Sequence, residues 1–277
     1  MKPREIVGLD EADRIHEQLG KLVEFHIPEA MVAFTSGSLP FGAAVRGDSD
    51  IDVNVILPAG TKPDDALFDR LSGFIDDYRN LHDQHGMRLD RRYPGEYFTI
   101  GQAHDAAAGR GIPVINGKPV LPREVGDSYW SSSEDTWYLA WMGALAFSRY
   151  IAGSRDILAG LRRQAWATIV ALCLPDLGCR DFDAEDVMAR ILDKDHPNGG
   201  FGVHPGYRRF AELEAFHCRQ ALEDLSTRGV LVRQDDDNFC AEGNELLRWA
   251  TELAARHQDG FRAASLLTVT SSLRLAI

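Results

Sequence analysis

The 277-residue sequence predicts an α+β protein, in which an α/β half is followed by a mostly helical half. Up to about residue 100, segments with helical spacing of apolar residues alternate with short apolar segments that are typical of strands. Beyond about residue 130, apolar residues recur almost everywhere with the helical period. We therefore place a boundary between residues 125 and 126, which gives two domains, 1–125 and 126–277.

The first half begins with a predicted helix over residues 10–26, where apolar side chains recur every three or four positions. Residues 31–35 are a short apolar run and predict a buried strand that enters a turn at residues 36–38. Residues 51–57 alternate between apolar and polar side chains, so this predicted strand buries one face and carries polar groups on the other. A second helix is predicted over residues 63–82.

A pair of strands is predicted next, in residues 87–90 and 96–100, and Pro94-Gly95 interrupts them. The helical half begins with a helix that follows the N-cap sequence Ser132 to Asp135 and ends at Gly153. The remaining predicted elements are helices over residues 155–174, 181–193 and 207–228, a small hairpin over residues 230–240 and a last helix over residues 243–257.

Acidic side chains outnumber basic ones by 42 to 30, which gives a formal net charge of −12. Such a surface repels a phosphate backbone, so nucleic acid is not expected as a partner. No stretch approaches the ~18–20 apolar residues that cross a membrane, and the N-terminus lacks the apolar region of a secretory signal. The four cysteines lack zinc-site spacing, so we expect reduced thiols. These features predict a cytoplasmic protein without a membrane partner.

The residues that point to chemistry are Gly37-Ser38 and, after eleven further residues, Asp50-Ile51-Asp52. Two carboxylates at positions i and i+2 of a strand point the same way, with Cα atoms roughly 7 Å apart, and their charges repel each other. A divalent cation reverses this repulsion, and Mg²⁺ prefers one or two carboxylates together with phosphate oxygens. The Gly-Ser turn would offer backbone N–H groups and a hydroxyl to those phosphates.

This pattern resembles the G-S…D-h-D signature of the polymerase-β-like nucleotidyltransferase superfamily, which includes the antibiotic (aminoglycoside) adenylyltransferases. The string from Gly47 to Asp52 is also similar to the superfamily's usual G-x-S-D-h-D. The resemblance covers residues 30–100 through its motifs and the rest of the chain through its layout. It implies a catalytic domain with a mixed sheet over residues 1–125 and a helical acceptor-binding domain over residues 126–277.

The same resemblance implies an activity. A superfamily member of this type transfers an NMP, such as AMP from ATP, from an NTP donor to a hydroxyl group of a small-molecule acceptor, with two Mg²⁺ ions and release of pyrophosphate. Asp50 and Asp52 would hold the metal ions, and a third carboxylate would ligate the second ion or act as the base. Asp90 is the first candidate for this catalytic and metal-binding group, and Glu96 is the alternative. Pro94-Gly95 between them departs from the commonest pattern of the superfamily.

The resemblance also implies which residues bind the nucleotide. Gly37 and Ser38 would bind the β- and γ-phosphates of the donor. Arg46 could neutralise the triphosphate, because a guanidinium matches phosphate geometry, although a surface role is favoured for this residue taken by itself. Ser49 belongs to the G-x-S-D-h-D string and is counted with these nucleotide-binding residues.

The identity of the acceptor is left open. Glu134 and Asp135 are either charges at a helix start or an acidic wall of the acceptor pocket, and an acidic protein suits a cationic small molecule. A protein side chain or an RNA end is the alternative acceptor, and a nucleotide-binding regulatory protein without catalysis is the alternative activity.

Two further sequence patterns could indicate a function, but each also has an ordinary structural explanation. Residues 207–241 resemble the recognition helix and wing of a winged-helix fold, but three aspartates, Asp235 to Asp237, stand where a DNA-contacting wing carries Lys or Arg. His82 and His85 have a spacing that could bind a metal, yet we expect a solvated helix end there.

Overall fold

The computed structural model describes residues 5–61, 65–89, 95–108, 143–177, 181–192 and 211–241. The chain divides into two compact units, which are described separately. The first comprises Met1–His104, Ile112–Ser132 and Phe147–Gly160, and the second comprises Asp105–Gly111, Ser133–Ala146 and Leu161–Ile277. The predicted boundary between residues 125 and 126 lies outside the described residues and stays a prediction. Among the helices that the structure describes, none combines the length and apolar character needed to cross a membrane.

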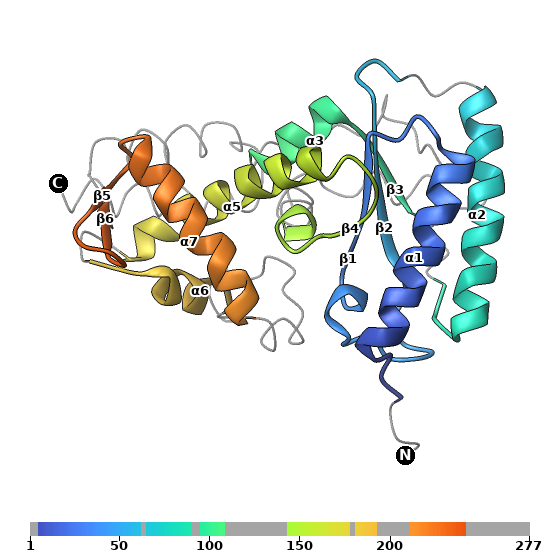
Figure 1. Cartoon of the computed structure of the whole chain (residues 1–277), viewed down its shortest axis with the longest axis horizontal. Helices are drawn as coiled ribbons and strands as arrows, with labels where there is room; N and C mark the ends of the chain where they lie inside the picture. The colour runs from blue at the N-terminus through green and yellow to red at the C-terminus, as the bar shows by residue number, and fades with distance from the viewer. Residues whose placement is uncertain are drawn as a thin grey trace. The chain divides into compact units, whose positions relative to one another are not determined.

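The first unit contains a four-stranded mixed sheet in the order β3-β2-β1-β4 (Figure 1). Its strands are β1 (Val32–Ser36), β2 (Asp52–Leu57), β3 (Glu96–Thr99) and β4 (Arg149–Gly153). Strand β1 pairs antiparallel with β2 and β4, whereas β2 pairs parallel with β3. The predicted α+β class is therefore confirmed, and the mixed sheet that the resemblance implies is present.

Helices α1 (Leu9–His26) and α2 (Asp65–His85) pack against each other on one face of this sheet (Figure 1). Their apolar residues recur at helical spacing, so each helix turns an apolar side toward the strands. The core that they bury includes alternate residues of the β2 segment: Ile51, Val53, Val55 and Leu57. The two predicted helices and the predicted strands over residues 31–35 and 51–57 are confirmed in type and place.

Of the two strands predicted around Pro94-Gly95, the second is confirmed as β3, whereas the described residues of the first, 87–89, are not part of a strand. Strand β3 lies parallel to β2 because the intervening helix α2 crosses back over the sheet. The segment before it makes other backbone hydrogen bonds: the N–H groups of Met87 and Arg88 donate to the carbonyls of His82 and Ser49, each at 2.9 Å. These bonds close the end of α2 and the loop ahead of β2. Strand β3 leads directly into α3 (Ile100–Ala107).

Strand β4 falls in a segment for which apolar spacing predicted a helix ending at Gly153. That prediction is wrong for residues 149–153, which pair antiparallel with β1. The pairing uses the free edge of β1, a tertiary interaction that local spacing does not reveal. Gly153 has φ +82°, and a Cβ atom there would lie 2.5 Å from the carbonyl oxygen of Met31. Glu134 and Asp135, at the predicted start of this helix, lie outside the described residues.

The second unit contains α6 (Ala184–Leu192), α7 (Ala211–Thr227) and an antiparallel hairpin of β5 (Leu231–Arg233) and β6 (Phe239–Ala241). A bridge between Phe182 and Phe239 ties the residues before α6 to this hairpin. The predicted helices and hairpin that fall on the described residues are confirmed in type, and the last predicted helix, over residues 243–257, lies outside them. Helix α5 (Arg155–Leu177) continues two residues beyond Pro175, where the sequence predicted its end.

Candidate active site

The turn after β1 lies against the carboxylate of Asp52. Strand β1 ends at Ser36, which pairs in register with Asp52, so Gly37 follows directly beside the start of β2. Gly37 has φ +72°, and a Cβ atom there would collide with Oδ2 of Asp52 and lie 3.0 Å from its Cγ. Only glycine fits, because a side chain would strain this backbone and displace the carboxylate. The structure thus brings the two halves of the predicted motif together.

The segment that carries Asp50 and Asp52 has one apolar and one polar face, as predicted. Ile51 and Val53 are each 1% exposed and belong to the core under the helices. Asp52, between them in sequence, points to the opposite face of the sheet and is half-buried. Asp50 directly precedes Ile51 and is also half-buried, so both carboxylates remain partly accessible.

Glu96 occupies the position on β3 from which a carboxylate can join this face. It is half-buried and pairs in parallel register with Asn54, which follows Asp52 by two residues on β2. Side chains at paired positions lie on the same side of a sheet, so Glu96, Asn54 and Asp52 share one face. Asp90, the first candidate for the third carboxylate, lies outside the described residues.

Tyr78 on α2 is a buried side chain that feels the charges of all three carboxylates. Its side chain is 1% exposed, and burial is the main reason that the pKa of its hydroxyl lies well above the usual range. The negative charges of Asp52, Asp50 and, more weakly, Glu96 raise this pKa further. Because burial and these charges both disfavour the phenolate, the hydroxyl stays protonated and can donate a hydrogen bond.

Two side chains of α2 hold the backbone between the aspartates. The Tyr78 hydroxyl donates to the carbonyl of Ile51, and the N–H of Ile51 donates to Nε2 of His82 at 3.1 Å. Nδ1 of His82 lies 2.9 Å from the carbonyl of Tyr78, so Nδ1 carries the proton and Nε2 accepts. Burial lowers the pKa of His82, which favours this neutral form. The expected solvated helix end is therefore wrong for His82, which has no exposed surface.

A second buried polar pair lies on the carboxylate-bearing face. Nδ2 of Asn54 donates to Oγ of Ser36 at 3.1 Å, and both residues are buried. Among the described residues, Oδ1 of Asn54 has no hydrogen-bond partner. Sequence reasoning did not single out this pair. The one available signal was the polar residue Asn54 inside an otherwise apolar strand.

Arg46 is engaged with carboxylates of its own chain. Its Nε contacts Glu5 at 2.7 Å, its Nη2 contacts Glu11 at 2.5 Å, and its Nη1 donates to the carbonyl of His85. These contacts raise the pKa of Arg46 and lower that of Glu11. The arrangement ties the loop ahead of β2 to the start of α1 and the end of α2. Each guanidinium nitrogen already has a partner, which does not favour the expected phosphate-binding role.

The two candidate serines differ in their surroundings. Ser49 accepts a hydrogen bond from the N–H of Val45 at 3.0 Å, so its hydroxyl closes the loop ahead of β2. Ser38 is half-buried and precedes a short 3₁₀ helix, η1 (Leu39–Phe41), without capping it through its side chain. The hydroxyl of Ser38 is therefore the better placed of the two for a ligand at the Gly37 turn.

The donor atoms on this face suit Mg²⁺. They are carboxylate oxygens, and Mg²⁺ takes one or two carboxylates from a protein when phosphates and water complete its coordination. Asp50 and Asp52 supply that number, and Gly37 leaves room for the Asp52 carboxylate. In the described ranges, which omit Asp90, no group of three or more His, Cys, Asp or Glu side chains has metal-binding spacing.

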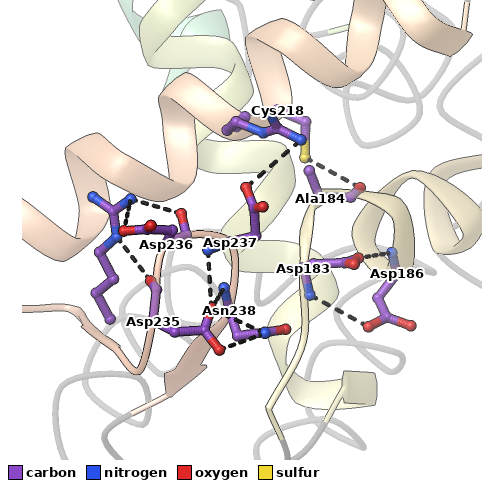
Figure 2. A network of polar contacts seen from close by, with 10 residues as sticks. Asp183, Ala184, Asp186, Cys218, Asp235, Asp236, Asp237 and Asn238 are labelled. Carbon is purple, nitrogen blue, oxygen red and sulfur yellow. Dashed lines mark hydrogen bonds and ion pairs between the residues drawn. The ribbon is translucent and has the colours of Figure 1, made fainter.

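The hairpin of the second unit carries its acidic turn at its tip, and Figure 2 shows the hydrogen bonds that form it. The Asp235 carboxylate accepts from the N–H groups of Asp237 (3.0 Å) and Asn238 (2.8 Å). Arg233 donates to the carbonyls of Asp235 and Asp236 and is thereby folded onto the turn. A turn of this charge repels a phosphate backbone, in contrast to a DNA-contacting wing.

Protein-family models, curated proteins and solved structures yield no match to the chain. The resemblance to the nucleotidyltransferase superfamily therefore rests on the motif residues of the sequence alone.

Proposed function

We propose that the protein is a Mg²⁺-dependent nucleotidyltransferase, which moves the NMP of an NTP such as ATP onto a hydroxyl group of a small-molecule acceptor. The observation that carries this proposal is the close approach of the Gly37 turn to Asp52, on a sheet face that also holds Glu96. Gathering like charges in a half-buried place is unfavourable by itself. Binding of a cation together with a triphosphate would offset this repulsion and so explain why the carboxylates lie together.

In the proposed reaction, the acceptor oxygen forms a bond to the α-phosphorus, and the bond from that phosphorus to the bridging β-oxygen breaks, so pyrophosphate leaves. Glu96 or Asp90 takes the proton of the attacking hydroxyl. The backbone and hydroxyl of Gly37-Ser38 bind the β- and γ-phosphates and so orient the donor. Mg²⁺ held by Asp50, Asp52 and the third carboxylate would supply charge neutralisation and a lower pKa of the acceptor hydroxyl.

The acceptor would bind to the helical domain proposed for residues 126–277. The net charge of −12 favours a cationic acceptor such as an amino sugar, and it disfavours an RNA end. Glu134 and Asp135 are the acidic residues that we propose for this pocket.

The test is pyrophosphate release with each NTP and Mg²⁺ across a panel of amino sugars, nucleosides and other hydroxylated metabolites. Asp52→Asn serves as the blank, because it removes one metal-binding charge and keeps the size of the side chain. Release that requires both Asp52 and one acceptor would establish the activity and the acceptor class together.

Two other outcomes redirect the proposal. If the whole panel gives no release but Mg²⁺-dependent ATP binding is measured, a protein acceptor or a non-catalytic nucleotide sensor replaces the small-molecule acceptor. If no NTP binds in the presence of Mg²⁺, the nucleotidyltransferase proposal is wrong.

A further inference from the structure

Tyr78 and His82 take the place of a strand partner for the residue between the two aspartates. The pairing of β1 with β2 ends at Ser36 and Asp52, so Ile51 lies just beyond the ladder. At alternate positions of an antiparallel strand pair, the N–H and the C=O of a residue both form hydrogen bonds with the residue opposite. At Ile51 these two bonds go to the side chains of Tyr78 and His82.

Each of these hydrogen bonds fixes one of the two peptide groups that flank Ile51. The N–H of Ile51 belongs to the peptide that joins it to Asp50, and its carbonyl belongs to the peptide that joins it to Asp52. Since peptide groups are planar, holding both of them sets the directions in which the two aspartate side chains leave the backbone. The spacing of the two carboxylates therefore depends on α2.

The two helix side chains are themselves held firmly. They stand at positions i and i+4 of α2, with ring centroids 4.4 Å apart and ring planes at 74°. The ring of Phe74 stacks on Tyr78 with centroids 5.7 Å apart. Tyr78 is 1% exposed and His82 is fully buried, so neither can change rotamer without disturbing the core.

We infer that Tyr78 and His82 are positioning residues, which hold the Asp50 and Asp52 carboxylates at the separation needed for a divalent cation. This inference rests on the proposed function, because it concerns the metal site of that same reaction. Loss of either bond leaves a buried backbone group without its partner and frees one peptide group to turn. The affinity for the cation should then fall even where the chain stays folded.

The experiment measures binding of Mn²⁺ to the full chain by electron paramagnetic resonance, and unfolding by urea is followed in parallel. Tyr78→Phe and His82→Leu each remove one of the two bonds. His82→Gln keeps an acceptor oxygen for the N–H of Ile51. Tyr97→Phe is the matched control, because it also removes a buried phenol oxygen from this core, whereas the bond to the Ile51 carbonyl comes from Tyr78.

We expect Tyr78→Phe and His82→Leu to weaken Mn²⁺ binding about tenfold. His82→Gln should restore binding to within about threefold of the wild type, and Tyr97→Phe should leave it within about twofold. A purely structural role would instead lower the urea midpoint in both tyrosine variants and leave the Mn²⁺ affinity of the folded chain unchanged. If His82→Leu does not fold, Tyr78→Phe, which loses a single oxygen atom, decides the outcome.

Two results separate this inference from the proposed function. Asp52-dependent Mn²⁺ binding in the wild type that persists unchanged in Tyr78→Phe would overturn the inference alone. Absence of Asp52-dependent Mn²⁺ binding in the wild type would overturn the proposed function and the inference with it.

Discussion

A Cβ atom at position 37 would collide with Oδ2 of Asp52 and lie 3.0 Å from its Cγ. The Asp52 carboxylate can therefore occupy its position only because residue 37 of the adjacent turn is glycine. Gly37 follows β1, and Asp52 begins β2, and the antiparallel register of the two strands brings them side by side. The strand ladder therefore sets this contact.

Gly37→Ala should abolish nucleotidyl transfer and destabilise the fold by about 1–3 kcal/mol, since alanine is strained at φ +72° and collides with Asp52. Gly60→Ala is the matched control. Gly60 has φ +80°, but a Cβ atom there would meet nothing within 4 Å, so this variant carries the backbone strain alone. Urea unfolding and pyrophosphate release check both variants. Equal activity in the two would show that contact with Asp52 is not what matters at position 37.

Asp50→Asn and Asp52→Asn should each abolish transfer while the free energy of unfolding stays within about 1 kcal/mol of the wild type or rises. Each change removes a charge that a metal ion would need and eases repulsion among the carboxylates that act on Tyr78. Calorimetric unfolding and pyrophosphate release measure the two effects separately. Near-normal transfer in either variant would contradict the two-metal mechanism.

Glu96→Gln should lower kcat by a factor of about 100 or more, as expected when a general base or metal ligand loses its charge. The basis is its place on β3, on the same sheet face as Asp52. Asp90→Asn is the comparison, because the sequence offers Asp90 as the other third carboxylate. Whichever variant suffers the larger loss of kcat in steady-state assays identifies the third carboxylate, and a loss for Asp90 alone would remove Glu96 from the mechanism.

The sequence was sufficient to predict the two faces of the segment that carries Asp50 and Asp52, because strand alternation is local. Asp50 and Asp52 are two residues apart, and strand alternation alone divides them from Ile51 and Val53. The hydrogen bonds from Tyr78 and His82 could not be predicted in this way. They join residues 27 and 31 positions apart, and a buried Tyr on an apolar helix face looks the same whether or not its hydroxyl binds backbone.

Strand β4 was missed, and the parallel pairing of β3 was not predicted, for a similar reason. Residues 149–153 have spacing that suits a helix, and only the open edge of β1 makes them a strand. Residues 96–99 were recognised as a strand, but their direction depends on the crossover by α2 and not on any nearby turn. Strand pairing is a tertiary interaction, whereas the spacing of apolar residues along the sequence reports only local structure.

Arg46→Met should destabilise the fold by an amount on the order of 1 kcal/mol and leave the KM for ATP within about threefold of the wild type. The guanidinium contacts Glu5 and Glu11 and donates to the carbonyl of His85, so its loss loosens the loop ahead of β2. Denaturant unfolding and steady-state kinetics at saturating acceptor check the two parts. A rise of KM by a factor of about 100 with unchanged stability would make Arg46 a ligand of the triphosphate after all.

Acidification should destabilise the protein through His16, whose pKa burial lowers to about 4 from an unfolded value of 6.5. The nearby charge of Arg149 lowers this pKa as well, and Asp13 opposes both. Above pH 6.5 the imidazole is neutral in both the folded and the unfolded chain, so its titration does not change the free energy of unfolding. Between pH 6.5 and 4 only the unfolded chain takes up the proton, and stability falls by up to roughly 3 kcal/mol. In His16→Leu, urea unfolding should show a shallower pH dependence across this interval, and an unchanged slope would mean that His16 is already protonated in the fold.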